Sequence, residues 1–290
     1  MLIRIREFLL DRLTGTPSDR VLNESTGRAP TLTPSQPLDE ALRGLMNRLI
    51  GEAVSPDGSR VDYARLRTSP LFREDFMELA AGLAHFNPAD LPELPQQMSF
   101  WINIYNVLVL HGVIALGVQR SVSERWAGLT FFRQAAYRIG GQRLSLDDIE
   151  HGILRVNRGH PLLPGAQFAD GDPRLDWVLP RLDERIHFTL NCASRSCPPI
   201  GVYQPEQLDR QLDLATAHFV DQDVERPTGN SLRLSSIFRW YQGDFGGKEG
   251  VIDFLRRYLP ENDPRREWIE THRHTLSLIY RPYDWGLNQF

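Results

Sequence analysis

The stretch SFWINIYNVLVLHGVIAL, residues 99–116, constrains this chain more than any other segment. Its residues are apolar almost all the way round a helical wheel, and a helix of that kind must be buried on every side. We therefore predict a central helix around which the rest of the chain packs. No stretch approaches the roughly 20 apolar residues of a membrane span, so we expect none.

A few polar residues of this helix do not belong in an apolar core. At about 100° per residue, Asn103, Asn106 and His111 fall in one sector. Buried amides and imidazoles need hydrogen-bond partners, so this sector must face other polar groups. Two interpretations remain open. The asparagines bind neighbouring loops and His111 is a core histidine, or the three line a pocket together with Trp101 and Tyr105.

A second helix is expected after Ser145, which is a suitable amino-terminal cap. Its apolar stripe includes Ile149 and Ile153. Glu150 falls inside that stripe and His151 lies on its flank. A carboxylate on a buried face needs a partner or a raised pKa. Glu150 is therefore either paired with an arginine, or it acts as a general base or orients a catalytic imidazole.

The segment RIHFTLNC, residues 185–192, is short and rich in β-prone apolar residues, and is predicted to be a buried strand. Alternation would place His187 and Asn191 on one face, an arrangement with which thiol hydrolases hold an imidazole.

The chain's only cysteines, Cys192 and Cys197, follow in the turn that ends this strand. Their spacing is wider than in most structural zinc sites. A disulfide across the loop is geometrically feasible, but reduced thiols are the rule in a cytoplasm. As a nucleophile we favour Cys197, because two prolines stiffen the chain after it and Arg195 is near. Cys192 could be a small apolar residue.

Composition narrows the remaining function classes. With 290 residues, 41% hydrophobic and 24% charged, the chain is typical of a soluble globular protein, and its net charge of −4 gives no general field for nucleic acid. Residues 2–13 predict an amphipathic helix, docked on the body or attached to a membrane surface. Since charges interrupt it, we expect no signal peptide and a cytoplasmic location. Residues 14–37 read as a loose connector. The expected domains are thus 1–37, helix and linker, and 38–290, a single domain.

Several blocks together resemble domain-of-unknown-function family 547 (DUF547). They are FWINIYNVLVLHG, YRIGGQRLSLDDIEHGILR and DERIHFTLNCASRSCPPIGVYQPEQLDRQLDLATAHFV, followed by WYQGDFGG and YDWGLN. The resemblance spans roughly 60–288. The residues that it carries over are Trp101, Asn103, Tyr105, Asn106, His111, Glu150, His151, His187, Asn191, Cys192, Cys197 and Pro198. A relation to papain-like or transglutaminase-like thiol enzymes is an analogy only.

The order of elements, helices first and a few strands later, predicts an α+β fold: a helix-rich domain around a small, mainly antiparallel sheet. Three functional hypotheses follow. The first is a thiol-dependent hydrolase or acyl transferase with a Cys197 or Cys192 nucleophile, a small-molecule or peptide substrate, and neither metal nor cofactor. His187 or His151 would carry the proton. The second is a non-catalytic scaffold with a buried polar network. The third is a metal site built from histidines and a cysteine.

Overall fold

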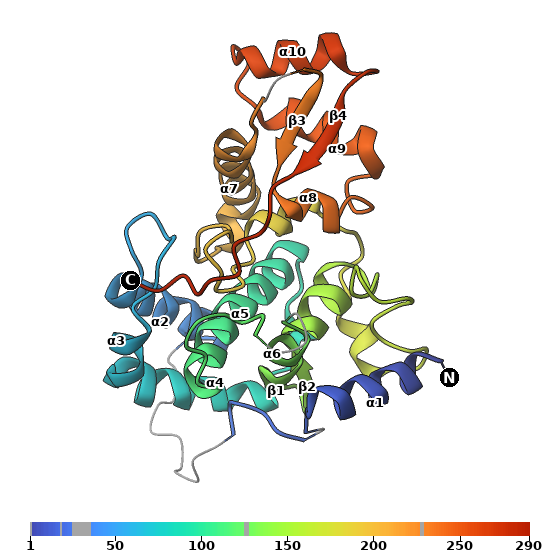
Figure 1. The fold of residues 1–290 in the computed structure, drawn as a ribbon. Coiled ribbons are helices and arrows are strands. Elements are labelled where there is room, and N and C mark those ends of the chain that lie inside the picture. The colour runs from blue at the N-terminus through green and yellow to red at the C-terminus, as the bar shows by residue number, and fades with distance from the viewer. Residues whose placement is uncertain (1, 18, 25–35, 125–127, 227–228) are drawn as a thin grey trace.

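Helices dominate the architecture of the computed structural model, which describes residues 2–17, 19–24, 36–124, 128–226 and 229–290 (Figure 1). The α-helices are α1 (Leu2–Thr14), α2 (Leu38–Ala53), α3 (Tyr63–Thr68), α4 (Met77–Gly82), α5 (Leu94–Ala115), α6 (Leu129–Gln134), α7 (Leu208–Asp223), α8 (Ser236–Trp240), α9 (Gly247–Tyr258) and α10 (Pro264–His272). Two π-helical turns, η1 (Leu71–Phe76) and η5 (Asp148–Leu154), join 3-10 turns that include η7 (Glu184–Phe188).

The described strands form two separate ribbons. Strand β1 (Ala136–Ile139) pairs antiparallel with β2 (Gln142–Ser145), and β3 (Ser231–Leu234) pairs parallel with β4 (Ser277–Tyr280). The predicted helix-rich α+β class is confirmed. The expectation of a single, mainly antiparallel sheet is wrong, because the long helical connection between β3 and β4 brings them together in parallel.

Helix α5 is the central element, as its composition predicts. Nearly all its residues from Met98 to Val113 are buried, and the helices before and after it surround it (Figure 1). Among the described helices it alone has the length and hydropathy of a membrane span, yet 89% of that window is covered by the rest of the fold. It is therefore placed as the core helix of a globular fold.

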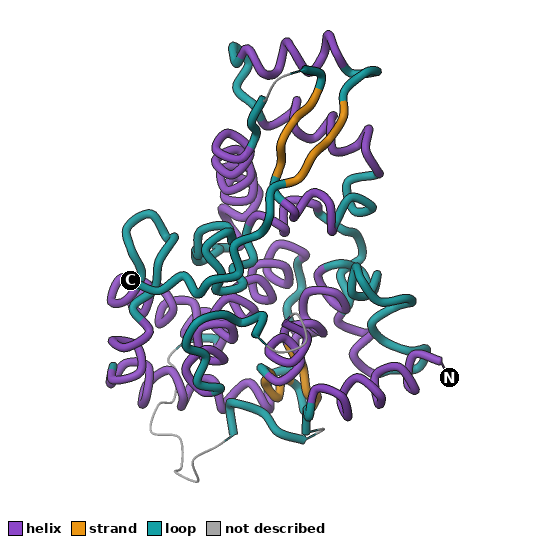
Figure 2. The backbone as a smooth tube through the Cα atoms, in the orientation of Figure 1, coloured by secondary structure: helices purple, strands orange, loops and turns teal. Residues whose placement is uncertain are grey.

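Two clusters of buried apolar side chains hold the fold together. The larger surrounds α5, and the smaller lies between α7, α9, α10 and the β3–β4 ribbon. Long loops connect the two regions (Figure 2), and the segment after β4 returns from the second to the first. Burying these side chains stabilises each region by roughly 25 cal/mol for each Å² of apolar surface removed from water.

The strand predicted over residues 185–192 is wrong. Glu184–Phe188 forms the 3-10 turn η7, and the backbone N–H groups of Thr189 and Leu190 both donate to the carbonyl of Ile186. These local bonds occupy groups that a sheet would need. His187 and Asn191 therefore do not share the face of a strand.

The connector expected over residues 14–37 lies partly outside the described residues. In its described part, Thr16, Val21 and Asn23 are buried. The Asn23 amide donates to the carbonyls of Ala80 and Arg138 at 2.8 and 3.0 Å, and accepts from the Arg138 N–H at 2.8 Å. This stretch thus lies along β1 and is not a loose linker.

Candidate active site

A cavity of about 520 Å³ lies beside Tyr105 at the middle of α5, at the junction of the two regions. Ligand sites of small-molecule enzymes have this size and mix apolar walls with a few polar groups. The polar wall comprises Tyr105, Ser123, Asp147, Glu150, His151, His160, His187, Cys192, Cys197, Tyr241 and Tyr283. Aromatic and aliphatic side chains, including Phe132, Trp240 and Trp285, supply the rest. Six predicted site residues, Tyr105, Glu150, His151, His187 and both cysteines, therefore meet in one space.

The two cysteines are joined in a disulfide, the alternative that the sequence had left open beside reduced thiols. The Tyr283 hydroxyl lies 3.3 Å from Cys192 Sγ and 3.2 Å from Cys197 Sγ. The backbone N–H of Cys192 donates to Cys197 Sγ at 2.8 Å. In this form neither sulfur is a nucleophile, since the thiolate is the reactive species.

His187 is oriented by Asp244, a residue 57 positions later. The ring Nε2 lies 2.9 Å from Asp244 Oδ2, and the ring stacks on Tyr241 with centroids 4.0 Å apart. Arg155 donates to the same carboxylate at 2.6 and 3.1 Å. Burial would raise the pKa of Asp244, but the bonds from His187 and Arg155 outweigh it and hold the pKa well below its usual range. The carboxylate stays ionised and fixes the ring.

The protonation state of His187 suits a base. Burial lowers the pKa of His187 and outweighs the opposing effect of Asp244. The ring is therefore neutral at pH 7. Its Nε2 donates to the ionised Asp244, which leaves Nδ1 with a free lone pair. A histidine in this tautomer can accept a proton from a thiol or a water.

Among the described residues, Glu150 forms no ion pair with an arginine, and its Oε1 lies 3.8 Å from His151 Nδ1. Its two oxygens accept hydrogen bonds from the hydroxyls of Tyr105 and Tyr241, at 2.9 and 2.5 Å. Burial, and then the charge of Glu150, raise the pKa of both tyrosines well above the usual value. Both phenols remain donors, so Glu150 ties α5 to the segment after α8. Ser145 Oγ accepts from the Asp148 N–H at 3.2 Å, as predicted for a cap, although the turn η5 that carries Glu150 begins only at Asp148.

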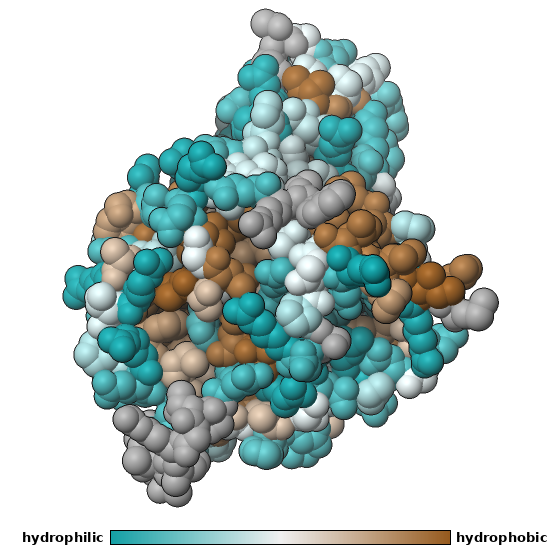
Figure 3. Space-filling view, turned by 60° about the horizontal axis from the view of Figure 1, so that its bottom comes forward, coloured by the Kyte–Doolittle hydropathy of each residue, from teal (hydrophilic) through white to brown (hydrophobic). Residues whose placement is uncertain are grey.

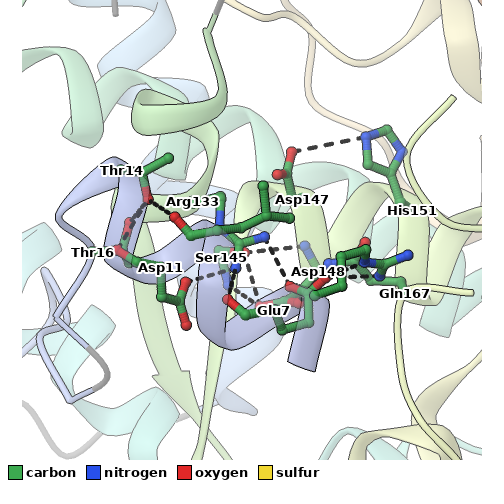
Figure 4. A network of polar contacts seen from close by, with 12 residues as sticks. Glu7, Asp11, Thr14, Thr16, Arg133, Ser145, Asp147, Asp148, His151 and Gln167 are labelled. Atoms are coloured by element: carbon green, nitrogen blue, oxygen red, sulfur yellow. Dashed lines mark hydrogen bonds and ion pairs between the residues drawn. The ribbon is translucent and has the colours of Figure 1, made fainter. Parts of the chain in front are cut away.

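Asp147, His151 and His160 form the one described cluster whose candidate ligand atoms all lie within 4.8 Å of one another. His151 Nε2 is 3.8 Å from Asp147 Oδ1 (Figure 4). The guanidinium of Arg155 donates to His151 Nδ1 at 3.1 Å, and the Leu162 N–H donates to His160 Nδ1 at 3.1 Å. Each neutral ring must then carry its proton on Nε2. Metal coordination needs a free nitrogen lone pair, so this arrangement suits an oxygen acceptor better than a cation.

The other predicted residues lie away from the cavity. The Asn103 amide binds both backbone groups of Tyr203, and Asn106 binds the Thr189 carbonyl and the Asn191 N–H. His111 Nδ1 is 3.0 Å from the Tyr137 hydroxyl, and burial lowers its pKa to about 4. The remaining three are buried Trp101, which packs on Trp177, Asn191, which binds the Pro198 carbonyl, and exposed Arg195, near Asp284.

Three residues that the sequence interpretation left out are important here: Asp244, Tyr241 and Tyr283. All lie in or beside the motifs WYQGDFGG and YDWGLN. The available signal for Asp244 was an acidic residue among aromatic and glycine residues. Nothing in the sequence spacing indicates that it contacts His187. His160 was also missed, since a lone histidine beside Pro161 reads as a loop residue.

We predict that Asp147→Asn makes the stability of the protein less dependent on pH. Burial raises the pKa of Asp147 to about 8, from an ordinary value of 3.8. Between these values the folded state binds more protons than the unfolded chain, so this contribution to stability is complete below about pH 4 and is lost as pH rises through 8. The variant should be more stable than the parent at pH 8 by at least about 1 kcal/mol, with no difference near pH 4. Urea unfolding at both pH values measures this, and equal curves at pH 8 would contradict it.

Comparison with known proteins identifies a family model that matches part of the chain. Residues 90–220 match the family model described as "Protein of unknown function, DUF547". The match confirms the resemblance over a shorter range than the motifs suggested, and it covers Glu150, His151, His187 and both cysteines. No curated protein and no solved structure matches the chain. Residues 90–220 of the chain are therefore similar to the DUF547 family.

Proposed function

We propose that the cavity is the active site of a thiol-dependent hydrolase or acyl transferase acting on an amide, ester or thioester. The observation that carries this proposal is that Cys197 and His187 line one cavity with His151 and His160, while Asp244 orients the His187 ring. A nucleophile, a base with its orienting group, and donors for a carbonyl oxygen are the parts that acyl transfer needs.

The active form requires reduction of the disulfide. Two electrons and two protons from a thiol reductant convert the Cys192–Cys197 bond into two thiols. The reducing cytoplasm expected from the sequence would provide such a reductant. Cys197 is favoured as the nucleophile because its sulfur accepts a hydrogen bond from the backbone N–H of Cys192. Hydrogen bonds to the charged form of a group lower its pKa.

The chemical step uses the neutral ring of His187. Nδ1 takes the thiol proton, and the Cys197 thiolate adds to the carbonyl carbon of the substrate. The bond to the leaving group then breaks, and His187 returns the proton to that group. Water or a second acceptor releases the acyl group from sulfur. His151 and His160, which line the same cavity, would donate to the carbonyl oxygen.

The scaffold hypothesis explains Asn103 and Asn106, whose contacts are structural, but not the cavity. A buried polar network needs partners for each group, not an open space lined by a disulfide and three histidines. A large cavity without a ligand forfeits packing contacts. The apolar part of the wall favours a substrate with an apolar body.

Alkylation by iodoacetamide tests the proposal. Without reductant we expect no labelling of either cysteine. After reduction, Cys197 should label quickly near pH 6, since a thiol stabilised by donors ionises below the free value of about 8.5. His187→Ala should slow this labelling in a still-folded protein, and mass spectrometry separates Cys197 from Cys192.

The control is His274→Ala, a change in the exposed turn after α10 that lies outside the cavity lining and should leave the labelling rate unaltered. If both reduced cysteines label slowly at pH 6, the thiol-enzyme proposal is wrong. If Cys192 alone is fast, the chemistry stands and the nucleophile is reassigned.

A further inference from the structure

Helix α1 presents its apolar side to solvent instead of to the core. Its five most exposed apolar side chains are Leu2 (79%), Ile5 (48%), Phe8 (64%), Leu9 (50%) and Leu13 (57%). They share one side of the helix, because residues three to four positions apart lie on one face. Figure 3 shows hydrophobic residues gathered at the side of the molecule that carries the start of α1.

The polar side of α1 is what docks on the body. Arg133, itself buried, binds Glu7 at 2.8 Å and Asp11 at 2.6 Å (Figure 4). Arg6 donates to the carbonyls of Pro164 and Ala166. These contacts fix the rotation of α1 about its own axis. Because they hold its polar side on the body, the apolar side must point outward.

The charges left on the outward side are positive. Arg4 and Arg12 are exposed, whereas both acids of the helix are engaged by Arg133. Asp170 is the one acid in the shallow hollow beside Arg4. An apolar stripe flanked by arginines is the pattern of a helix that lies in the interface of an anionic bilayer. If two copies of the protein paired symmetrically through this face, each arginine would lie against the same arginine of the other copy or against uncharged apolar side chains.

We propose that the outward face of α1 binds an anionic lipid bilayer. Leu162, 71% exposed, extends this surface. It belongs to the loop whose Pro164 carbonyl accepts from Arg6, and together with His160, Pro161 and Leu163 it lines the large cavity. Bilayer contact through α1 therefore sets one edge of the cavity against the lipid surface. This inference does not depend on thiol chemistry.

Flotation with vesicles tests the proposal on the full chain. Vesicles of phosphatidylcholine with 30% phosphatidylserine should carry the protein upward in the gradient, with at least about fivefold less bound to phosphatidylcholine alone. The double change Phe8→Glu and Leu9→Glu should lower binding at least about tenfold, because two carboxylates enter the apolar stripe. Arg4→Gln with Arg12→Gln should remove the preference for anionic vesicles and retain weak binding to both.

The matched control is Leu214→Glu, an equally exposed leucine on α7 (58%), which should float like the parent. All changed side chains are exposed, so unaltered thermal unfolding confirms folding of each variant. Failure of the parent to float with anionic vesicles overturns the proposal. A dimer in light scattering that the Phe8 and Leu9 changes dissociate, without vesicle binding, also overturns it and assigns the face to a second copy.

Discussion

Replacing Asp244 with alanine is expected to lower the free energy of unfolding by about 3–5 kcal/mol. Arg155 and Asp244 are both almost fully buried and lie 2.6 Å apart. The variant leaves the Arg155 guanidinium in a low-dielectric site without its counter-charge, and it removes the acceptor of His187 Nε2. Losing one partner of a buried pair is costly because the other cannot regain its hydration. Urea unfolding at pH 7 measures the change.

The control for this prediction is Glu270→Ala. Glu270 also pairs with an arginine, Arg256, at 2.8 Å, but its side chain is 57% exposed. Water screens such a pair, so the change should be below about 1 kcal/mol. Equal losses in the two variants would show that the Asp244 pair is not a buried, stabilising contact. The labelling of reduced Cys197 should slow in Asp244→Asn, which keeps the shape of the side chain but not its charge.

Asn106→Ala is expected to cost about 2–4 kcal/mol, although Asn106 does not touch the cavity. Its fully buried amide donates to the Thr189 carbonyl at 3.0 Å and accepts from the Asn191 N–H at 2.9 Å. Alanine leaves both backbone groups buried without these partners. The cysteine loop directly follows Asn191, so the labelling rates of reduced Cys192 and Cys197 should also change. Denaturant unfolding and labelling of one sample measure both effects.

Asn230→Ala is the matched control, since the Asn230 amide is exposed and donates to the Thr275 hydroxyl at 3.2 Å. Surface changes of this kind stay within about 0.5 kcal/mol. If Asn106→Ala is as mild, the asparagines of α5 do not hold the loops that they contact, and their role must be sought in the cavity.

Sequence patterns predicted the features that depend on residues close to one another in the chain. The apolar residues of 99–116 required a buried helix wherever the rest of the chain went. Ser145 finds its capping partner, the Asp148 N–H, three residues later. Glu150, His151, His187 and the cysteines were identified because polar groups stood in apolar surroundings. In each case the signal lies within a few positions of the residue concerned.

The failures have the opposite origin. RIHFTLNC has the composition of a strand, but no described strand pairs with it, and local turns satisfy part of its backbone. Asp244 meets His187, and Tyr283 meets the sulfurs, only through tertiary folding, across separations that spacing cannot encode. The disulfide, too, depends on how the loop places two sulfurs, which the five-residue separation permits but does not require.

The stretch after β4 has a consequence for the order of events during biosynthesis. It leaves the second region and crosses the first, where Asn288 accepts from the Val61 N–H and donates to the Ala193 carbonyl, while Tyr283 reaches the sulfurs (Figure 1). A ribosome that has translated the whole family-matched range has therefore not yet supplied this part of the cavity wall. Until residues 283–288 emerge, the cysteine loop lacks its covering segment, so the sulfur chemistry of a nascent chain is that of an unfinished, open site.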